Sequence, residues 1–491
     1  MLLGFAAILY FMGMLFILLY SLAQVHLLYH YLQKRKGPNV KPIEMKDAKI
    51  PVTIQLPVYN EMYVVERLLH AVAQMEYPSD LLEIQVLDDS TDQTSELIRD
   101  VIAQYPNLDF KHLHRTDRSG FKAGALREGL KTSKGELIAI FDADFVPDSQ
   151  FILKTLPHFE NPKVGMVQSR WTHLNKDFSL FTRLQAFALD AHFVVEQTGR
   201  NVQGAFINFN GTGGIWRKEC ILDAGNWQDD TLTEDLDLSY RAQQKGWEFI
   251  YRPDIESPAE LPPIMSAIKS QQFRWTKGGA ECAKKHLLDV WAKPFSHMIK
   301  FHSAAHLLNA VVFPAVIAVC LSSIVLWYGM YTEELGYSLF KFTSFFLLGF
   351  LGVVIVYFIA NASIGDFKTK AVVQTLLDLP LFFAVSMGLS LHNSIAVWEG
   401  MSGKKSPFVR TPKYNLKEKG SSISNNLYHL KSLPASTFVE MLLSMVFFIL
   451  VVVSLKSEIY GFLLLHMLLA FGFGAVSFAS LNIFLKPASF E

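Results

Sequence analysis

Two pairs of carboxylates each follow an apolar run that has the character of a β-strand: Asp88 with Asp89, and Asp142 with Asp144. A carboxylate at the first position can accept hydrogen bonds from a nucleobase or a ribose. Two carboxylates one residue apart can converge on a hard cation, because Mg²⁺ and Mn²⁺ prefer oxygen ligands and keep substrate phosphates in their shell. Each pair alone also fits a turn or a helix N-cap, where Asp is common.

Two further elements could supply a base and a cation. In Thr233-Glu234-Asp235, a carboxylate beside a hydroxyl can act as general base. The same residues also fit the first turn of a helix, where the macrodipole favours acidic side chains. The glycine-flanked stretch 120–124 can bring Lys122 close to phosphates, although it lacks the full spacing of a P-loop.

A third element places Gln271, Arg274 and Trp275 just before a long apolar run. An indole ring can stack on a sugar face, and a guanidinium can pair with a diphosphate through its planar fork. An aromatic residue and a cation that anchor an interfacial helix would give the same pattern. The glycine-rich stretch 210–214 is either a tight loop on the acceptor side or an ordinary turn.

The elements that must position these side chains alternate between strand and helix over residues 46–262. Strands are expected at 52–56, 83–87, 110–113 and 137–141, and helices at 61–74 and 94–104. This alternation predicts an α/β domain with a mostly parallel sheet. Ligands bind outside the carboxyl ends of the strands in such sheets, which is where the candidate residues lie.

Long apolar runs flank this domain on both sides. Residues 1–33 contain no Asp, Glu, Lys or Arg and are followed by Lys34–Lys36, which predicts a spanning anchor with a cytoplasmic basic end. Further runs of near-spanning length are 301–332, 342–365, 441–455 and 459–485. We expect interfacial helices over 263–300 and a transmembrane channel region over 301–491.

The apolar run 371–398 differs from the others because it carries Asp378 and Pro380 near its middle. A charge at the bilayer centre costs roughly 3 kcal/mol on insertion scales. If this run crossed the membrane, the basic loop 399–435 would lie outside, against the positive-inside tendency. We therefore predict an interfacial helix over 371–398, a cytoplasmic loop over 399–435 and five spans in all.

Composition excludes some classes of function. The chain has 45 basic and 45 acidic residues, so its charge gives no reason to expect a nucleic-acid partner. The three cysteines are widely spaced, which predicts free thiols rather than a disulfide framework or a zinc site.

Taken in order, these motifs resemble the D, DxD, TED and QxxRW pattern of the processive glycosyltransferases of family 2, the cellulose synthase superfamily. The stretches 55–61, 85–92 and 209–217 are similar to plant cellulose-synthase-like mannan and glucan synthases and their bacterial relatives. Residues 408–413 resemble the family's gating loop, FxVTxK, with Arg410 where that pattern has Val.

The resemblance implies a GT-A fold, an inverting single displacement and Mg²⁺ or Mn²⁺ as cofactor. For the donor, the resemblance implies nucleoside contacts for Asp88 and Asp89, nucleotide contacts for Lys122, Asp142, Gln271 and Arg274, and metal ligation for Asp142 and Asp144. For the acceptor, it implies proton abstraction by Asp235, with Glu234 and Thr233 beside it, and stacking on Trp275. It also implies gating by Phe408, Thr411 and Lys413.

The resulting prediction is a multi-pass membrane enzyme with a cytoplasmic catalytic domain, in a bacterial inner membrane or a Golgi or plasma membrane. It would transfer hexose from UDP-glucose or GDP-mannose to a growing β-glucan or β-mannan and pass the product into the bilayer. The sequence identifies no protein partner. One alternative is a nonprocessive transferase with a lipid acceptor. Another is a transporter or receptor with a nucleotide-binding domain, which would explain the spans but not the ordered motifs.

Overall fold

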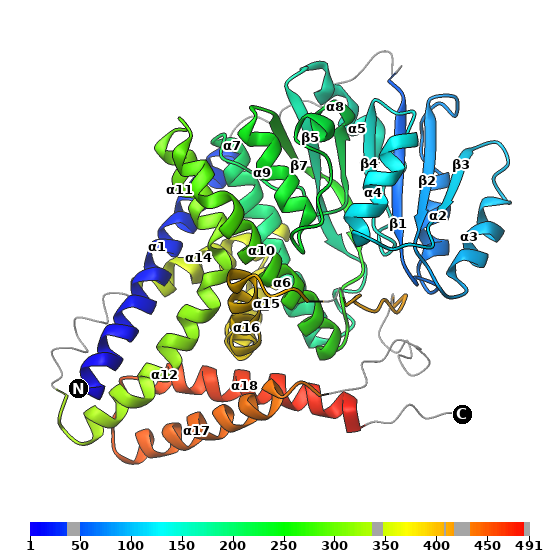
Figure 1. Cartoon of the computed structure of the whole chain (residues 1–491). Helices are drawn as coiled ribbons and strands as arrows, with labels where there is room; N and C mark the ends of the chain where they lie inside the picture. The colour runs from blue at the N-terminus through cyan, green and yellow to red at the C-terminus, as the bar shows by residue number, and fades with distance from the viewer. Residues whose placement is uncertain (37–49, 336–346, 407–408, 417–432, 486–491) are drawn as a thin grey trace.

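The protein combines an α/β domain with a group of long helices that extends from one side of it (Figure 1). The computed structural model describes residues 1–36, 50–335, 347–406, 409–416 and 433–485. All three cysteines are buried and unpaired.

The α/β domain contains one sheet of seven strands in the order β3-β2-β1-β4-β6-β5-β7. The strands are β1 (Val52–Val58), β2 (Leu82–Asp88), β3 (Asp109–His114), β4 (Leu137–Ile140), β5 (Val164–His173), β6 (Gly214–Arg217) and β7 (Glu248–Ala259). Neighbouring strands are parallel except where β6 pairs with β4 and β5. The mostly parallel sheet is confirmed, and each of the four predicted strands lies within two residues of its expected bounds.

Helices cover both faces of this sheet. One face packs against α2 (Val65–Ala73), α3 (Thr94–Ile102) and α5 (Phe151–Thr155), and the other against α4 (Phe121–Thr132), α8 (Lys218–Asp223) and α9 (Glu234–Gln244). Because both faces are buried, the central strands are almost continuously apolar in sequence. The α2 helix begins four residues after its predicted start, because residues 59–64 form a turn at the edge of the sheet.

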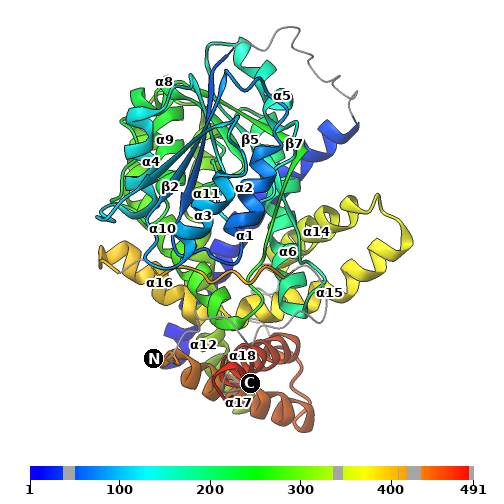
Figure 2. The same cartoon turned by 90° about the vertical axis from the view of Figure 1, so that its right-hand side faces the viewer.

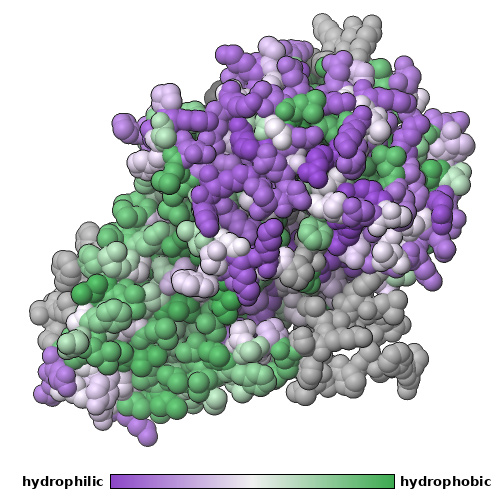
Figure 3. Space-filling model, viewed as in Figure 1, coloured by the Kyte–Doolittle hydropathy of each residue, from purple (hydrophilic) through white to green (hydrophobic). Residues whose placement is uncertain are grey.

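Six helices in the described part of the chain are long and apolar enough to cross a membrane. They are α1 (Leu2–Lys36), α12 (Val312–Tyr331), α14 (Leu347–Ile364), α15 (Thr369–Gly388), α17 (Ser436–Lys456) and α18 (Leu463–Leu485). Hydrophobic surface is concentrated over these helices, whereas the α/β domain is largely hydrophilic (Figure 3). Large side chains such as Phe5 and Phe448 are more than half exposed there. This distribution indicates a membrane protein.

The segment predicted as one interfacial helix over 371–398 forms two helices, α15 and α16 (Ser390–Ser402), which meet at Leu389. Both lie between the α/β domain and the α17–α18 pair (Figure 2). The buried carboxylate of Asp378 accepts a hydrogen bond from Arg183 of α6 (Leu180–Ala191) at 3.0 Å. The acidic residue of α15 is therefore paired with the α/β domain. Six helices could cross a membrane by length and composition, and α15 is the one that the five-span prediction places in the interface. The five-span topology stays a prediction.

The link between the two parts is α10 (Met265–Ala292), which is followed by α11 (His297–Leu307). Ion pairs and hydrogen bonds join α10 to three other helices: Lys269 to Glu440 of α17 (2.7 Å), Lys277 to Glu399 of α16 (3.3 Å), and His286 to Asp237 of α9 (2.8 Å). Breaking a buried pair of this kind is costly, because one charge is left uncompensated. The helix that carries Gln271, Arg274 and Trp275 is thus held in place from both sides.

Candidate active site

One cavity of about 200 Å³ at the carboxyl edge of the sheet collects residues from every predicted motif. The predicted site residues that line it are Asp89, Lys122, Asp142, Asp144, Thr233, Glu234, Asp235, Gln271, Arg274, Trp275, Thr411 and Lys413. Among the described members of the predicted set, only Asp88 does not line this cavity. Phe408 lies outside the described residues.

Asp88 and Asp89 point to opposite faces of the sheet, because consecutive side chains alternate along a strand. Asp89 lines the cavity, whereas the fully buried carboxylate of Asp88 accepts hydrogen bonds from Ser90, Ser95 and His112. Burial by itself would raise the pKa of Asp88, but these hydrogen bonds outweigh burial and hold the pKa well below its usual range. The geometry supports a nucleoside contact for Asp89, and such a contact for Asp88 stays a prediction.

Two arginines beside Asp89 were not singled out by the sequence. Arg115 donates to both carboxylate oxygens of Asp89, at 2.7 and 2.5 Å. Arg118 lies 3.9 Å from the same carboxylate, and its guanidinium carbon lies 3.4 Å from the centre of the Tyr59 ring. A planar cation stacked on an aromatic ring, next to an acceptor, suits a nucleobase. The only sequence signal was the run of basic residues before the glycine-flanked Lys122.

The two carboxylates predicted to bind metal are each paired with a lysine. Lys122 donates to Asp142 at 2.5 Å, and Lys413 donates to Asp144 at 2.5 Å. Burial by itself would lower the pKa of Lys122, but the charges of Asp142, Glu234 and Asp235 raise it above its ordinary value. The donor set contains only carboxylate oxygens and opens into the cavity, so it fits Mg²⁺ or Mn²⁺ together with phosphate oxygens.

The segment 409–416 lies against the cavity and contacts four of the residues that line it. Arg410 donates to both oxygens of Glu61 at 2.9 and 2.6 Å, and Thr411 accepts from Arg274 at 2.8 Å. Lys413 contacts Asp144, and the backbone N–H of Tyr414 donates to Glu260 at 2.8 Å. Arg410 replaces the valine of the gating-loop pattern, and its partner Glu61, which lines the same cavity, was assigned no role from the sequence.

Asp235 lies in the first turn of α9, next to Glu234. The helix N-terminus and the backbone N–H of Leu236, which donates at 2.8 Å, both favour its charged form. Burial and the negative charge of Glu234 nevertheless raise the pKa of Asp235 to about 7. Burial also raises the pKa of Glu234. A carboxyl group with a pKa near neutrality is suited to take a proton from a hydroxyl group.

The raised pKa predicts how activity depends on pH. Because only the carboxylate of Asp235 can accept a proton, kcat/KM should rise with pH through about 7. Glu234→Gln removes a negative charge that raises this pKa, so the rising limb should move to lower pH. The measurement is the pH profile of kcat/KM for the wild type and the variant. A limb that stays in place or moves upward would show that these two groups do not control the profile.

Gly211 lies against the carboxylate of Asp235 with a φ of +81°. A Cβ at this position would lie 2.9 Å from Asp235 Oδ2 and 3.4 Å from Lys122 Nζ. Gly211→Ala should therefore reduce activity by displacing Asp235. Gly204→Ala is the matched control, since Gly204 has a φ of +71° but nothing within 4 Å of a Cβ.

Both alanine variants should lose about 1 kcal/mol or more of stability from backbone strain. Only the Gly211 variant should lose transfer activity beyond that shared loss. Thermal unfolding measured beside initial rates separates the two effects, and equal rates in the two variants would contradict the close packing inferred for Gly211.

Thr233 precedes α9 and contacts α10. Its Oγ1 lies 3.4 Å from Cys282 Sγ, and a Cβ on Gly278 would come within 2.5 Å of its methyl group. This close packing sets the separation between α9, which carries Asp235, and α10, which carries Trp275. Thr233 therefore contributes to the site chiefly as a spacer between the two helices.

A second cavity of about 410 Å³ adjoins the first and shares Leu189, Gln271 and Trp275 with it. Its walls are mainly apolar and come from α1, α6, α10, α12, α14, α15, α16 and the turn Asn309–Val311. Trp275 thus stands at the boundary between the polar cavity of the α/β domain and a space among the apolar helices.

The α/β domain is similar to known glycosyltransferases. Residues 50–278 match the family described as "Glycosyltransferase like family 2". Probable glucomannan 4-beta-mannosyltransferase 7 of Oryza sativa subsp. japonica is 42% identical over 284 residues, covering 56% of this chain and 48% of that protein. Glucomannan 4-beta-mannosyltransferase 1 of Cyamopsis tetragonoloba is 40% identical over 290 residues, covering 56% and 55%. The chain spans about half the length of the curated relatives it matches.

Among solved structures, this chain is similar to the mannosyltransferase PcManGT from Pyrobaculum calidifontis in complex with GDP-Man and Mn²⁺. The TM-score is 0.53 and the sequence identity is 19%. The similarity covers 79% of this chain and 100% of that one. The sheet, its cavity and this likeness define a glycosyltransferase fold of the GT-A type. Residues 50–278 are a glycosyltransferase domain of family 2, which confirms the resemblance of the ordered motifs.

Proposed function

We propose that this chain is an inverting hexosyltransferase that extends a β-linked polysaccharide at a membrane surface. The observation that carries the proposal is the convergence of Asp142, Asp144, Asp235 and Trp275 on one cavity, although they come from three distant parts of the sequence. The transporter or receptor interpretation gives no reason for a potential base and a stacking ring to share that cavity.

In this proposal each charged group has a separate task. The donor nucleoside lies against Asp89 and Arg118, and its diphosphate reaches Lys122 and Arg274. Asp142 and Asp144 would hold Mg²⁺ or Mn²⁺, which would neutralise the diphosphate as it leaves. Lys413 must then release Asp144 when the cation and donor bind. The contacts of segment 409–416 would therefore depend on whether the donor is bound.

Asp235 takes the proton from the acceptor hydroxyl as that hydroxyl attacks the anomeric carbon. The nucleoside diphosphate leaves from the opposite face of the sugar, so an α-linked donor gives a β linkage. Trp275 holds the terminal sugar of the acceptor by stacking. Positioning and electrostatic stabilisation supply the rest of the rate, because the cavity is already lined by fixed charges.

The donor that we propose is GDP-mannose. The support is the similarity to proteins named glucomannan 4-beta-mannosyltransferases, together with a GT-A fold seen elsewhere with GDP-Man and Mn²⁺. The test is a panel of radiolabelled GDP-mannose, GDP-glucose, UDP-glucose and UDP-N-acetylglucosamine with purified protein, followed by linkage analysis. Incorporation only from a UDP-sugar would reject GDP-mannose as the donor, but it would still agree with hexosyl transfer.

The adjoining apolar cavity suits two kinds of acceptor. A polysaccharide could pass from Trp275 into the space among the helices, or the tail of a lipid acceptor could occupy that space. We favour the polysaccharide because Trp275, one of the three residues shared by the two cavities, is aromatic and can stack on a sugar. Product size separates the two, since a single sugar on an extractable lipid would reject the polymerase and a long β-linked chain would reject the lipid acceptor.

Trp275→Ala is expected to raise the acceptor KM by roughly 5- to 150-fold, since stacking on an aromatic side chain is worth about 1–3 kcal/mol. Donor KM should change much less, because Trp275 lies on the membrane side of the cavity. Kinetics with a short oligosaccharide acceptor at fixed donor give both constants. Trp171→Ala, a second indole on the same cavity, is the control, and equal losses for donor and acceptor in the Trp275 variant would indicate a structural tryptophan.

A further inference from the structure

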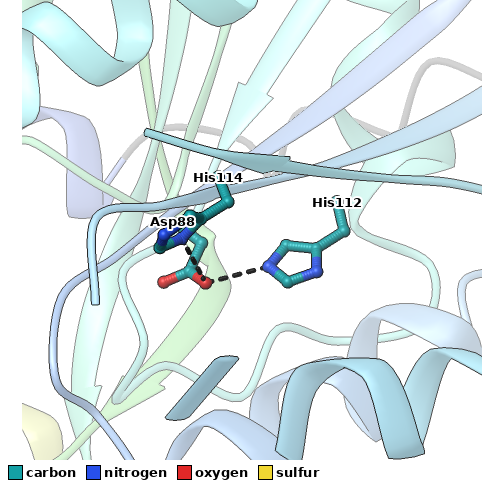
Figure 4. Close-up of side chains that lie close together, drawn as sticks. All are labelled: Asp88, His112 and His114. Carbon is teal, nitrogen blue, oxygen red and sulfur yellow. Dashed lines mark hydrogen bonds and ion pairs between the residues drawn. The ribbon is translucent and has the colours of Figure 1, made fainter. Parts of the chain in front are cut away.

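A second group of potential metal ligands lies on the opposite face of the sheet from Asp89. Asp88 at the end of β2 faces His112 and His114, which are alternate residues of the neighbouring edge strand β3. Alternate residues of a strand point to the same side, so both imidazoles reach the same carboxylate. Figure 4 shows the two rings directed at one oxygen of Asp88.

Three polar groups surround that oxygen. Asp88 Oδ2 lies 2.5 Å from Ser95 Oγ, 2.9 Å from His112 Nε2 and 3.2 Å from His114 Nδ1. Two of the three are imidazoles, whose nitrogens bind a metal ion when they carry no proton. If one histidine nitrogen is unprotonated, its lone pair faces the carboxylate without a proton between them. A cation among the three groups removes this conflict.

We propose that Asp88, His112 and His114 bind a divalent transition metal ion, Zn²⁺ in the first place, at a site separate from the catalytic cation. Tetrahedral zinc with bonds of about 2.0–2.2 Å places its ligand atoms roughly 3.3–3.5 Å apart. One ligand atom from each residue lies within 4.8 Å of the others, so a small rotation of the rings achieves this spacing.

The chemistry of this donor set differs from that of the cavity. Two imidazoles and one carboxylate favour zinc and similar ions, whereas the carboxylates Asp142 and Asp144 favour Mg²⁺ or Mn²⁺. Ser95 and the backbone N–H of Ser90 donate to Asp88 and fix its orientation, as neighbouring groups do for metal ligands. The side chain of His114 is 43% exposed, which gives the ion a path and water a ligand position.

Bound zinc would join the edge strand β3 to β2 beside the nucleoside end of the cavity. Asp89 and Arg115, the neighbours of Asp88 and His114 in sequence, form a bidentate pair, and Asp89 lines that end of the cavity. A metal held by residues of both strands would therefore stabilise this edge of the sheet. Since it binds the folded state alone, it would raise the unfolding temperature.

The test is isothermal titration of the detergent-purified full chain, free of a histidine tag and treated with chelator, with ZnCl₂. We expect one tight site in the wild type and at least about tenfold weaker binding in His112→Gln and in His114→Gln. The zinc-dependent rise in unfolding temperature should disappear in the double variant. His70→Gln, another partly exposed histidine of the α/β domain, is the control and should bind as the wild type does.

Asp144→Asn should keep the zinc site while weakening the response to Mn²⁺, which separates the two metals. Cobalt can replace zinc, and its visible absorption is strong only in a tetrahedral site. This absorption therefore checks folding and coordination together. The proposal is overturned if the wild type shows no tight zinc site, or if the double histidine variant binds zinc as the wild type does. Neither result bears on whether the chain transfers sugar.

Discussion

Asp235→Asn is expected to lower hexose transfer by roughly 10²–10⁴-fold, the contribution of a well-placed general base. The substitution keeps the shape of the side chain, and an amide still accepts the hydrogen bond from the backbone N–H of Leu236. It removes the ability to take a proton. Because the role proposed for Asp235 is to deprotonate the acceptor, donor nucleotide binding should stay close to that of the wild type. Initial rates and nucleotide titrations on the same preparation measure both quantities.

The matched control is Asp230→Asn, which changes an exposed carboxylate that pairs with Lys285 before the same helix. This variant should keep wild-type rates. Near-normal turnover in Asp235→Asn would assign the base to another group, for which the adjacent Glu234 is the first candidate. A loss of nucleotide binding in the same variant would mean that Asp235 holds the donor instead.

Removing divalent cations should have the second large effect. If a cation bound by Asp142 and Asp144 contributes several kcal/mol to leaving-group departure, chelation should reduce the rate by at least about 100-fold. Mn²⁺ or Mg²⁺ should restore it. Asp144→Asn should raise the metal concentration needed for half-maximal activity, and it also frees Lys413 from its partner.

Lys413→Met provides the complementary comparison. Removing the competing ammonium should let the cation bind Asp144 at lower concentration, so its half-maximal concentration should move opposite to that of Asp144→Asn. Undiminished activity in excess chelator would exclude a metal role for these carboxylates. A shift in the same direction for both variants would exclude competition between Lys413 and the cation.

Much of the α/β domain could be predicted because local signals agreed with the fold. The central strands are short apolar runs that end in polar residues, and parallel pairing brings their carboxyl ends to one edge. The motif residues that follow Leu87 and Ile140 therefore had to converge. The positions of Asp235 and Trp275 could not be predicted from local sequence signals, because they depend on how α9 and α10 pack. Only the order of the motifs indicated that these residues belong to the same site.

Other features depend on contacts between distant residues and have no local signal. The pairing of Arg410 with Glu61 joins positions 349 residues apart, and that of Lys269 with Glu440 joins positions 171 apart. The division of roles between Asp88 and Asp89 follows from strand alternation, but only once the end of β2 is known. The break at Leu389 was also missed, since both sides of it are apolar helix.

Sugar polymerisation can be tested by incubating the purified protein with Mn²⁺ and radiolabelled GDP-mannose and measuring the size and linkage of the labelled product. We expect a long β-linked polymer that forms only with divalent cation and is lost in Asp235→Asn. No transfer from any nucleotide hexose, by protein that is folded and binds nucleotide, would contradict this expectation.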